Sequence, residues 1–265
     1  MRLLISDKTL LTKKTDEFFT GLTKGFEFFL RFFKELFTGK FEGKEFIKQC
    51  YEVGYKSLFL ITLTGFITGL VFTKQSRPSL MEFGATSWIP SLVAIAIVRA
   101  LAPLVTALIA AGKVGSQIGA ELGSMKVTEQ IDAMEVSAIN PFKYLVVTRV
   151  LATTLMMPIL MCFTGFVAML GSYLNVHTNE LTSLTAFFIS AFEKISFLDI
   201  WSSLTKGIVY GFTIGIVGCY KGFNASNGTE GVGKAANASV VLSMFLIFVE
   251  EILIVQITNS IRGGL

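Results

Sequence analysis

The sequence is poor in the residues that build metal and redox sites. Its 265 residues include one histidine, His177, and three cysteines, Cys50, Cys162 and Cys219. The cysteines lie far apart, and their spacing matches neither a zinc ligand set nor a redox pair. We interpret them as small packing residues and assign no ligand role to His177. No cofactor is therefore expected in this chain.

Charged residues are also scarce: they make up 16% of the chain, whereas apolar residues make up 52%. A membrane-spanning helix needs about 20 mostly apolar residues. Five stretches qualify, residues 55–73, 88–111, 145–176, 200–219 and 239–258, and the third could be one tilted helix or two pieces broken at Pro158. A soluble protein of 265 residues could not bury five such stretches in its core. The sequence predicts an all-α, multi-pass membrane protein.

Lysine and arginine are unevenly distributed around these spans. They are concentrated before the first span and after the second and fourth spans, and they are few in the other connections. Because basic residues favour the cytoplasmic side of a membrane, we expect the N-terminus inside and the C-terminus outside. The net charge of +4 is then a consequence of topology and does not indicate nucleic-acid binding.

Residues 16–37 are too charged to span a membrane, yet they have an apolar helical stripe. The stripe consists of Phe18, Leu22, Phe26, Phe29, Phe33 and Leu36. Such a helix is typical of the cytoplasmic membrane interface, with its apolar face in the acyl region; alternatively, it could pack on another subunit. We therefore divide the chain into a cytoplasmic N-terminal part, residues 1–54, and a five-span membrane domain, residues 55–265.

Glycines recur at four-residue spacing in two places. The triplets are Gly115, Gly119 and Gly123 after the second span, and Gly207, Gly211 and Gly215 in the fourth. Small residues at this spacing let helix backbones approach closely in lipid. The triplets predict tight helix packing, either within one subunit or between two.

A few ionisable residues lie inside the expected spans. Arg99 is near the middle of the second, Lys206 lies in the fourth, and Glu250, with Glu251 beside it, lies in the fifth. Charge in lipid is costly, so such residues usually face a partner or a polar cavity. Either Arg99 or Lys206 pairs with Glu250, or these residues line a chamber that holds a charged headgroup.

No enzyme motif is complete. Residues 228–235, GTEGVGKA, match seven positions of a phosphate-binding loop, but Ala235 replaces the hydroxyl residue that contacts Mg²⁺. We therefore predict that the chain is not an enzyme and has no nucleotide site of its own.

Residues 121–138 carry charge between two spans. Wound as one helix, they place Glu121, Glu129, Asp132 and Glu135 on one arc, opposite Val127, Ile131, Met134 and Ala138. Pro141 ends the helix, because proline disfavours helix at the preceding residue. A rigid cytoplasmic helix with one acidic side suits docking onto another protein.

At this point a family resemblance becomes specific. Residues 107–152, ALIAAGKVGSQIGAELGSMKVTEQIDAMEVSAINPFKYLVVTRVLA, closely resemble the signature of MlaE-type permeases, the membrane subunits of MCE-associated ABC lipid transporters. GVGKAANASVV (231–241) and VEEIL (249–253) also resemble this family.

The resemblance implies a homodimer in a bacterial inner membrane, with two cytoplasmic ATPase subunits that bind ATP and Mg²⁺. It also implies a periplasmic ring of MCE-domain proteins and, in many cases, a small STAS-domain partner. The cargo would be phospholipid or a related lipid, moved between the inner membrane and the outer envelope. Residues 121–138 would form the coupling helix, which would contact the ATPase through Glu121, Met125, Glu129, Asp132, Met134 and Glu135.

The resemblance also places candidate residues in a lipid cavity at the dimer interface: Arg99, Lys206 and Glu250. The family's Arg-Glu-Leu is Arg99-Ala100-Leu101 here, so the carboxylate that accompanies the arginine is absent. Arg99 then needs another partner, and of Glu250, water or a lipid phosphate we predict the phosphate. Two other classes stay open: an ion-coupled secondary transporter, which needs no ATPase, and a membrane scaffold that transports nothing.

Overall fold

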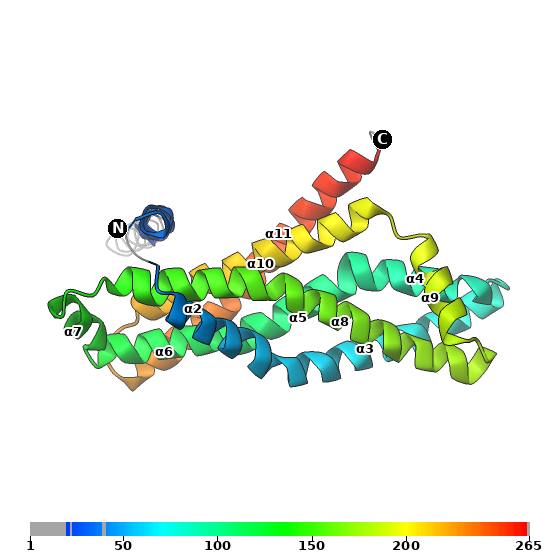
Figure 1. The fold of residues 1–265 in the computed structure, drawn as a ribbon, viewed down its shortest axis with the longest axis horizontal. Coiled ribbons are helices and arrows are strands. Elements are labelled where there is room, and N and C mark those ends of the chain that lie inside the picture. The colour runs from blue at the N-terminus through cyan, green and yellow to red at the C-terminus, as the bar shows by residue number, and fades with distance from the viewer. Residues whose placement is uncertain (1–19, 22, 39–40, 264–265) are drawn as a thin grey trace, which may run out of the picture.

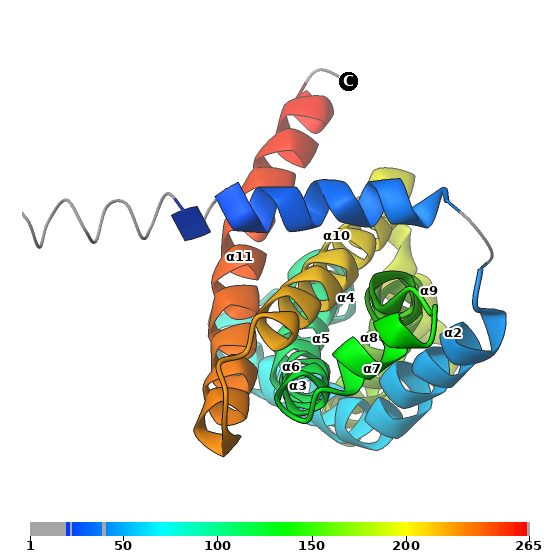
Figure 2. The same cartoon turned by 90° about the vertical axis from the view of Figure 1, so that its left-hand side faces the viewer.

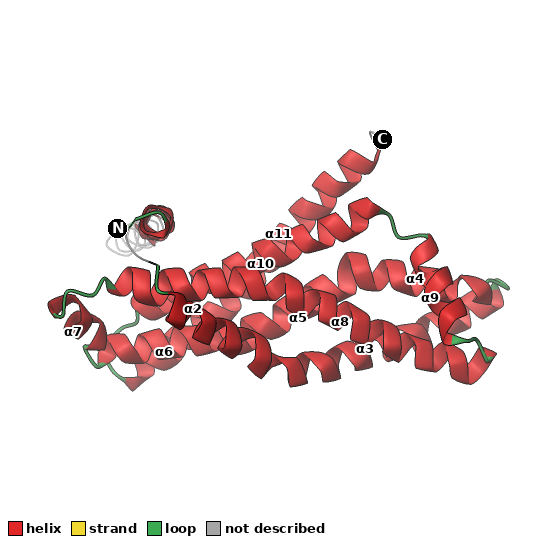
Figure 3. Cartoon of the chain, in the orientation of Figure 1, coloured by secondary structure: helices red, strands yellow, loops and turns green. Residues whose placement is uncertain are grey.

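The computed structural model describes residues 20–21, 23–38 and 41–263, and within these residues every regular element is helical (Figure 3). Five helical segments are long and apolar enough to cross a membrane: Gly43–Glu82, Thr86–Val127, Phe142–Glu180, Phe197–Phe223 and Thr229–Gly263. The prediction of an all-α protein with five spans is confirmed. Each segment extends beyond its apolar stretch, because the helices continue into the polar ends of the bundle.

The spans contain several short π-helical segments. The first span runs through α2 (Gly43–Cys50), η1 (Tyr51–Tyr55) and α3 (Lys56–Glu82). After a 3-10 turn, η2 (Thr86–Trp88), the second comprises α4 (Ile89–Ala96), η3 (Ile97–Leu101), α5 (Ala102–Ala110), η4 (Ala111–Gly115) and α6 (Ser116–Val127). The third comprises η5 (Phe142–Val147) and α8 (Thr148–Glu180), which continues through Pro158 as one helix.

The remaining helices complete an elongated bundle (Figure 1). They are α7 (Gln130–Val136), α9 (Leu184–Glu193), α10 (Phe197–Phe223) and α11 (Thr229–Gly263). The α6–α7 connection and the α10–α11 connection lie at one end, and α9 lies at the other. The C-terminal part of α11 diverges from the other long helices (Figure 1).

Both glycine triplets pack within this chain. A methyl group added at Gly211 of α10 would lie 2.5 Å from the carbonyl oxygen of Thr153 in α8. One added at Gly119 of α6 would lie 3.2 Å from the carbonyl oxygen of Ala235 in α11. In each triplet the other two glycines face the same neighbouring helix. Gly207 and Gly215 face α8, and Gly115 and Gly123 face α11. Contacts within one subunit therefore account for both triplets.

The N-terminal amphipathic helix lies across the bundle. Residues 20–21 and 23–36 are helical, and Figure 2 shows this helix crossing over α10 at a steep angle to the spans. Of the expected stripe, Phe26, Phe29 and Phe33 are exposed, while Leu36 packs against the core; Phe18 and Leu22 lie outside the described residues. The adjacent face also holds the helix on the bundle, since Phe32 is only 2% exposed.

The single helix expected over residues 121–138 is wrong. The helix α6 ends at Val127, Glu129 has a left-handed backbone with φ 58°, and α7 begins at Gln130. Ala138 is also left-handed, with φ 60°. The chain turns at Glu129 and buries Ile131, which is 1% exposed, against the core. Burial of this apolar side chain favours the turn over continuation of a straight helix.

The distribution of basic residues and the two ends of the bundle give a test of orientation. Ser79 and Asn179 are exposed near one end, and Asn227 is exposed in the connection at the other. In a cysteine-free background, Ser79→Cys and Asn179→Cys should react with an impermeant thiol reagent added to sealed bacterial cells, and Asn227→Cys should react only after lysis. Labelling of Asn227→Cys in intact cells would overturn the N-inside orientation.

Candidate functional site

A cluster of charges joins three spans in the half of the bundle that contains the C-terminus. Asp199, in the first turn of α10, is 2% exposed. One of its oxygens lies 2.7 Å from Nε of Arg99, and the other accepts a hydrogen bond from the same guanidinium at 2.8 Å. Arg262, near the end of α11, donates to Asp199 as well. One carboxylate therefore pairs with arginines from both the second and the fifth spans, and the three side chains together remain cationic.

Local sequence positions this carboxylate. Ser196 and Asp199 form a capping box at the start of α10, in which Asp199 accepts hydrogen bonds from the backbone and hydroxyl of Ser196, both at 3.0 Å. Arg99 lies in the π-helical segment η3, whose wider turn sets the direction of its side chain. The cap and the π turn together make the contact between Asp199 and Arg99.

Lys206 forms the second part of the cluster. Its side chain is 2% exposed, and its ammonium group donates to Glu251 at 2.6 Å and to the carbonyl oxygen of Arg99 at 2.8 Å. Tyr210 donates to the other oxygen of Glu251. The buried ammonium is thus satisfied by one carboxylate and one carbonyl, as a cation in lipid requires.

The expected pairing of Arg99 or Lys206 with Glu250 is wrong. Consecutive residues on a helix point about 100° apart, and here Glu251 is the residue that faces Lys206. Glu250 accepts a hydrogen bond from Thr213, and its second oxygen is buried without a partner among the described residues. Sequence reasoning missed Asp199 because it lies one residue before the expected fourth span. The Ser196–Asp199 capping pattern was the signal that could have identified it.

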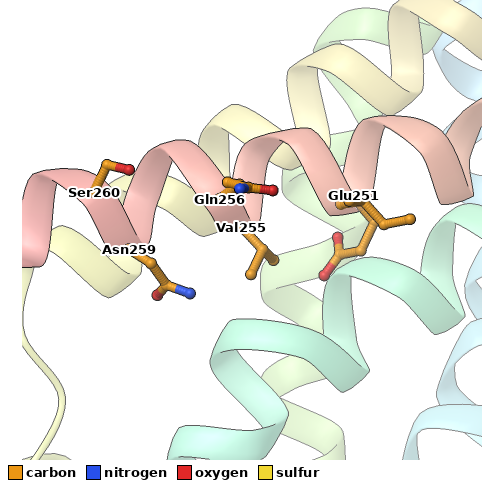
Figure 4. Close-up of a pocket in the computed structure, with 6 residues that line it drawn as sticks. Glu251, Val255, Gln256, Asn259 and Ser260 are labelled. Carbon is orange, nitrogen blue, oxygen red and sulfur yellow. The ribbon is translucent and has the colours of Figure 1, made fainter.

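An open groove of about 660 Å³ runs along the C-terminal half of α11, beside the charge cluster (Figure 4). Glu251, Val255 and Asn259 extend from one side of the helix, as their four-residue spacing requires, and Gln256 and Ser260 lie on another side of it (Figure 4). A smaller adjoining pocket of about 120 Å³ is lined by Arg99, Asp199 and Lys206, among others. Polar groups and apolar walls thus occur together within a membrane span.

The residues of the expected coupling helix separate into three groups. Glu129, Asp132 and Glu135 are exposed around α7, where Asp132 also pairs with Lys126 at 2.9 Å. Glu121 instead pairs with Arg149 at 3.3 Å and belongs to the side of the bundle. Met125 and Met134 pack against the core. The exposed acidic surface is therefore that of α7, and beside it Val136 is 90% exposed.

Five apolar spans around a buried charge cluster define a polytopic membrane protein. Residues 46–257 match the family model described as "Permease MlaE". A probable ABC transporter permease protein of Rickettsia typhi is 36% identical over 212 residues, which cover 80% of this chain and 82% of that protein. A protein of the same description from Synechocystis is 35% identical over 219 residues, covering 83% of each chain.

A plant protein is also similar. The chloroplastic protein trigalactosyldiacylglycerol 1 of Arabidopsis thaliana is 34% identical over 215 residues, which cover 80% of this chain and 61% of that protein. The fold and these matches define a permease of the ABC transporter class. The chain belongs to the MlaE permease family.

The Asp199 cluster predicts a strongly non-additive pair of substitutions. Asp199→Asn should destabilise the purified protein by about 2–4 kcal/mol, because removing one partner of a buried ion pair costs about 3–5 kcal/mol and both arginines are partly exposed here. The thermal unfolding midpoint in detergent should fall by roughly 5–10 °C. Adding Arg262→Gln to Asp199→Asn should recover part of this loss, because one surplus cation is removed. Equal and additive losses would show that the two residues are not coupled.

Proposed function

We propose that this chain is the membrane subunit of an ABC transporter that moves phospholipid or a related lipid between a bacterial inner membrane and the outer envelope. The groove on α11 carries the proposal, because a lipid headgroup needs polar contacts within the membrane while its chains need apolar walls. The nearby cations Arg99 and Lys206 give this region groups that favour a phosphate-containing headgroup. One relative, trigalactosyldiacylglycerol 1, bears the name of a lipid, which agrees with such a cargo.

Arg99 contributes differently from the sequence-based expectation. Its guanidinium already has Asp199 as a partner, in place of the carboxylate that the family pattern would have put at Ala100. The side chain remains 36% exposed toward the pocket. We propose that a bound headgroup would share Arg99 with Asp199. In this arrangement Lys206 keeps its bond to Glu251, and the neighbouring Glu250 keeps its hydrogen bond from Thr213.

We propose that two copies of the chain form a homodimer through α11. Only 17% of the most apolar stretch of this span is buried inside the subunit, the lowest share among the five spans. Large apolar side chains project from it, including Phe245, Phe248, Ile252, Leu253 and Ile257. A second copy packed on this face would close the open groove into a chamber shared by two subunits.

The remaining partners follow from the proposed transport cycle. An ABC permease works with an ATPase, which would bind ATP and Mg²⁺ and would dock on α7 in the cytoplasm. The N-terminus would then be cytoplasmic and the C-terminus periplasmic. An MCE-domain ring would receive or deliver lipid at the periplasmic end, and a STAS-domain protein could join the ATPase. An ion-coupled carrier or a scaffold would leave the acidic surface of α7 without a use.

The acidic surface of α7 generates a test of coupling. Glu129→Lys combined with Asp132→Lys should release the ATPase from the purified complex or uncouple ATP hydrolysis from lipid transfer, because several charges together set docking and register. The permease should still insert, since both side chains are exposed. Glu193→Lys, at the end of α9 on the other side of the bundle, is the matched control. Full coupling in the double variant would refute the assignment of α7.

The α11 groove generates a test of the cargo site. Gln256→Leu with Asn259→Leu should lower lipid phosphorus per permease and lipid transfer by at least about fivefold, because two lost hydrogen bonds together contribute about 1–3 kcal/mol. Assembly with the ATPase should be unchanged. Asn179→Leu, which removes an exposed amide away from the groove, is the control. Undiminished lipid and transfer in the double variant would exclude this groove as the cargo site.

A further inference from the structure

A second groove lies at the opposite half of the bundle, beneath the N-terminal amphipathic helix. It has a volume of about 920 Å³ and is bounded by that helix, α10 and α11. Its walls are mainly apolar and include Phe26, Phe29, Ile216, Val217, Leu242 and Leu246. Gly21 and Gly25 leave the helix side of the groove open, since a methyl group at either would meet nothing within 4 Å.

A polar pocket adjoins this groove and shares Phe28 and Tyr220 with it. The pocket has a volume of about 220 Å³, and its charged residues are Lys24, Glu27 and Arg31. Lys221 lines the groove itself, at the end nearest the α10–α11 connection. Three cations and one anion therefore surround the junction of the pocket and the groove.

The two parts lie where a membrane changes from polar to apolar. The amphipathic helix crosses the spans rather than following them (Figure 2), so its two sides face different depths. From Lys221, α10 runs inward to Ile216, while α11 runs inward past Leu242 to Leu246. The cationic end of the groove is thus superficial, and its apolar end is deeper.

We propose that this groove binds an anionic phospholipid of the cytoplasmic leaflet, with its acyl chains beneath the helix and its phosphate between Lys24 and Lys221. Basic pockets beside membrane helices on the cytoplasmic side attract anionic headgroups. Arg31 stacks on the ring of Phe142, 4.4 Å from its centroid, and adds positive potential. The site is separate from the α11 groove that contains Gln256 and Asn259. Binding of an anionic lipid here does not require that the chain transports lipid.

The amphipathic helix of a second copy fits this groove less well than a lipid does. If the amphipathic helix of another subunit entered, it would bring its own Lys24 and Arg31 toward the same residues here. Like charges brought together at an interface disfavour association. An anionic amphiphile satisfies both the apolar walls and the cationic end.

The test counts bound lipid by native mass spectrometry on the delipidated permease–ATPase complex, titrated with phosphatidylglycerol or phosphatidylcholine. Lys24→Gln with Lys221→Gln should weaken phosphatidylglycerol binding by about 25-fold, since each lysine near an anionic lipid contributes about fivefold. Phosphatidylcholine binding should change little. The matched control is Lys44→Gln with Lys48→Gln, which removes two exposed cytoplasmic charges away from the groove and should retain wild-type binding.

A second variant tests the apolar part independently. Gly25→Phe fills the open side of the groove and should reduce phosphatidylglycerol binding while both lysines remain. Both variants should keep the lipid that depends on Gln256 and Asn259, so a failure here is distinct from a failure of the cargo site. Equal phosphatidylglycerol binding in wild type and both variants would overturn the proposal. So would displacement of the lipid by inorganic phosphate, or dissociation of the dimer by Gly25→Phe, which would identify a second copy as the occupant.

Discussion

Close backbone approach is the constraint on which this bundle depends. Lipid provides no hydrophobic gain when two apolar helices meet, so the contact itself must supply the stabilisation. Gly211 lets α10 reach the backbone of α8, and Gly69 does the same for α3, where a methyl group would lie 1.9 Å from the carbonyl oxygen of Ala168. The helix α8 thereby becomes the centre of the fold. The helix α11 packs most closely in its first half, where Gly115, Gly119 and Gly123 face it, and many large apolar side chains of its later turns remain exposed.

Electrostatic pairing takes over where close packing ends. In the outer part of the bundle, α11 contacts its neighbours through Glu251 and Arg262, which pair with Lys206 and Asp199 of α10. Each of these charges would be costly alone in lipid, and together they bring a polar lining to a membrane-facing groove. The same pairs therefore both position α11 and line the site proposed for a headgroup.

Hydropathy was sufficient to predict the five spans, because length and apolar content are properties of contiguous sequence. It was not sufficient for partner choice. Whether Glu250 or Glu251 faces Lys206 depends on helix rotation, which small departures from regular geometry change. The break at Glu129 was also hidden, because an ideal helical wheel assumes that the helix continues. Asp199 shows a third limit: hydropathy gives no signal for a carboxylate just before a span, although tertiary contacts bury it.

The π-helical segments have a consequence for how this sequence can vary. Each one holds a residue more per turn than an α-helix, so the residues after it are rotated by about 100° relative to a regular continuation. With η3 and η4 in one span, the face that α6 presents to α11 depends on two such phase changes. A single-residue deletion there would reset the helical phase of everything between it and the next connection. Segments such as Ile97–Leu101 therefore set the helical phase of the residues that follow. At such a segment the number of residues, rather than the identity of their side chains, decides which residue faces the interior.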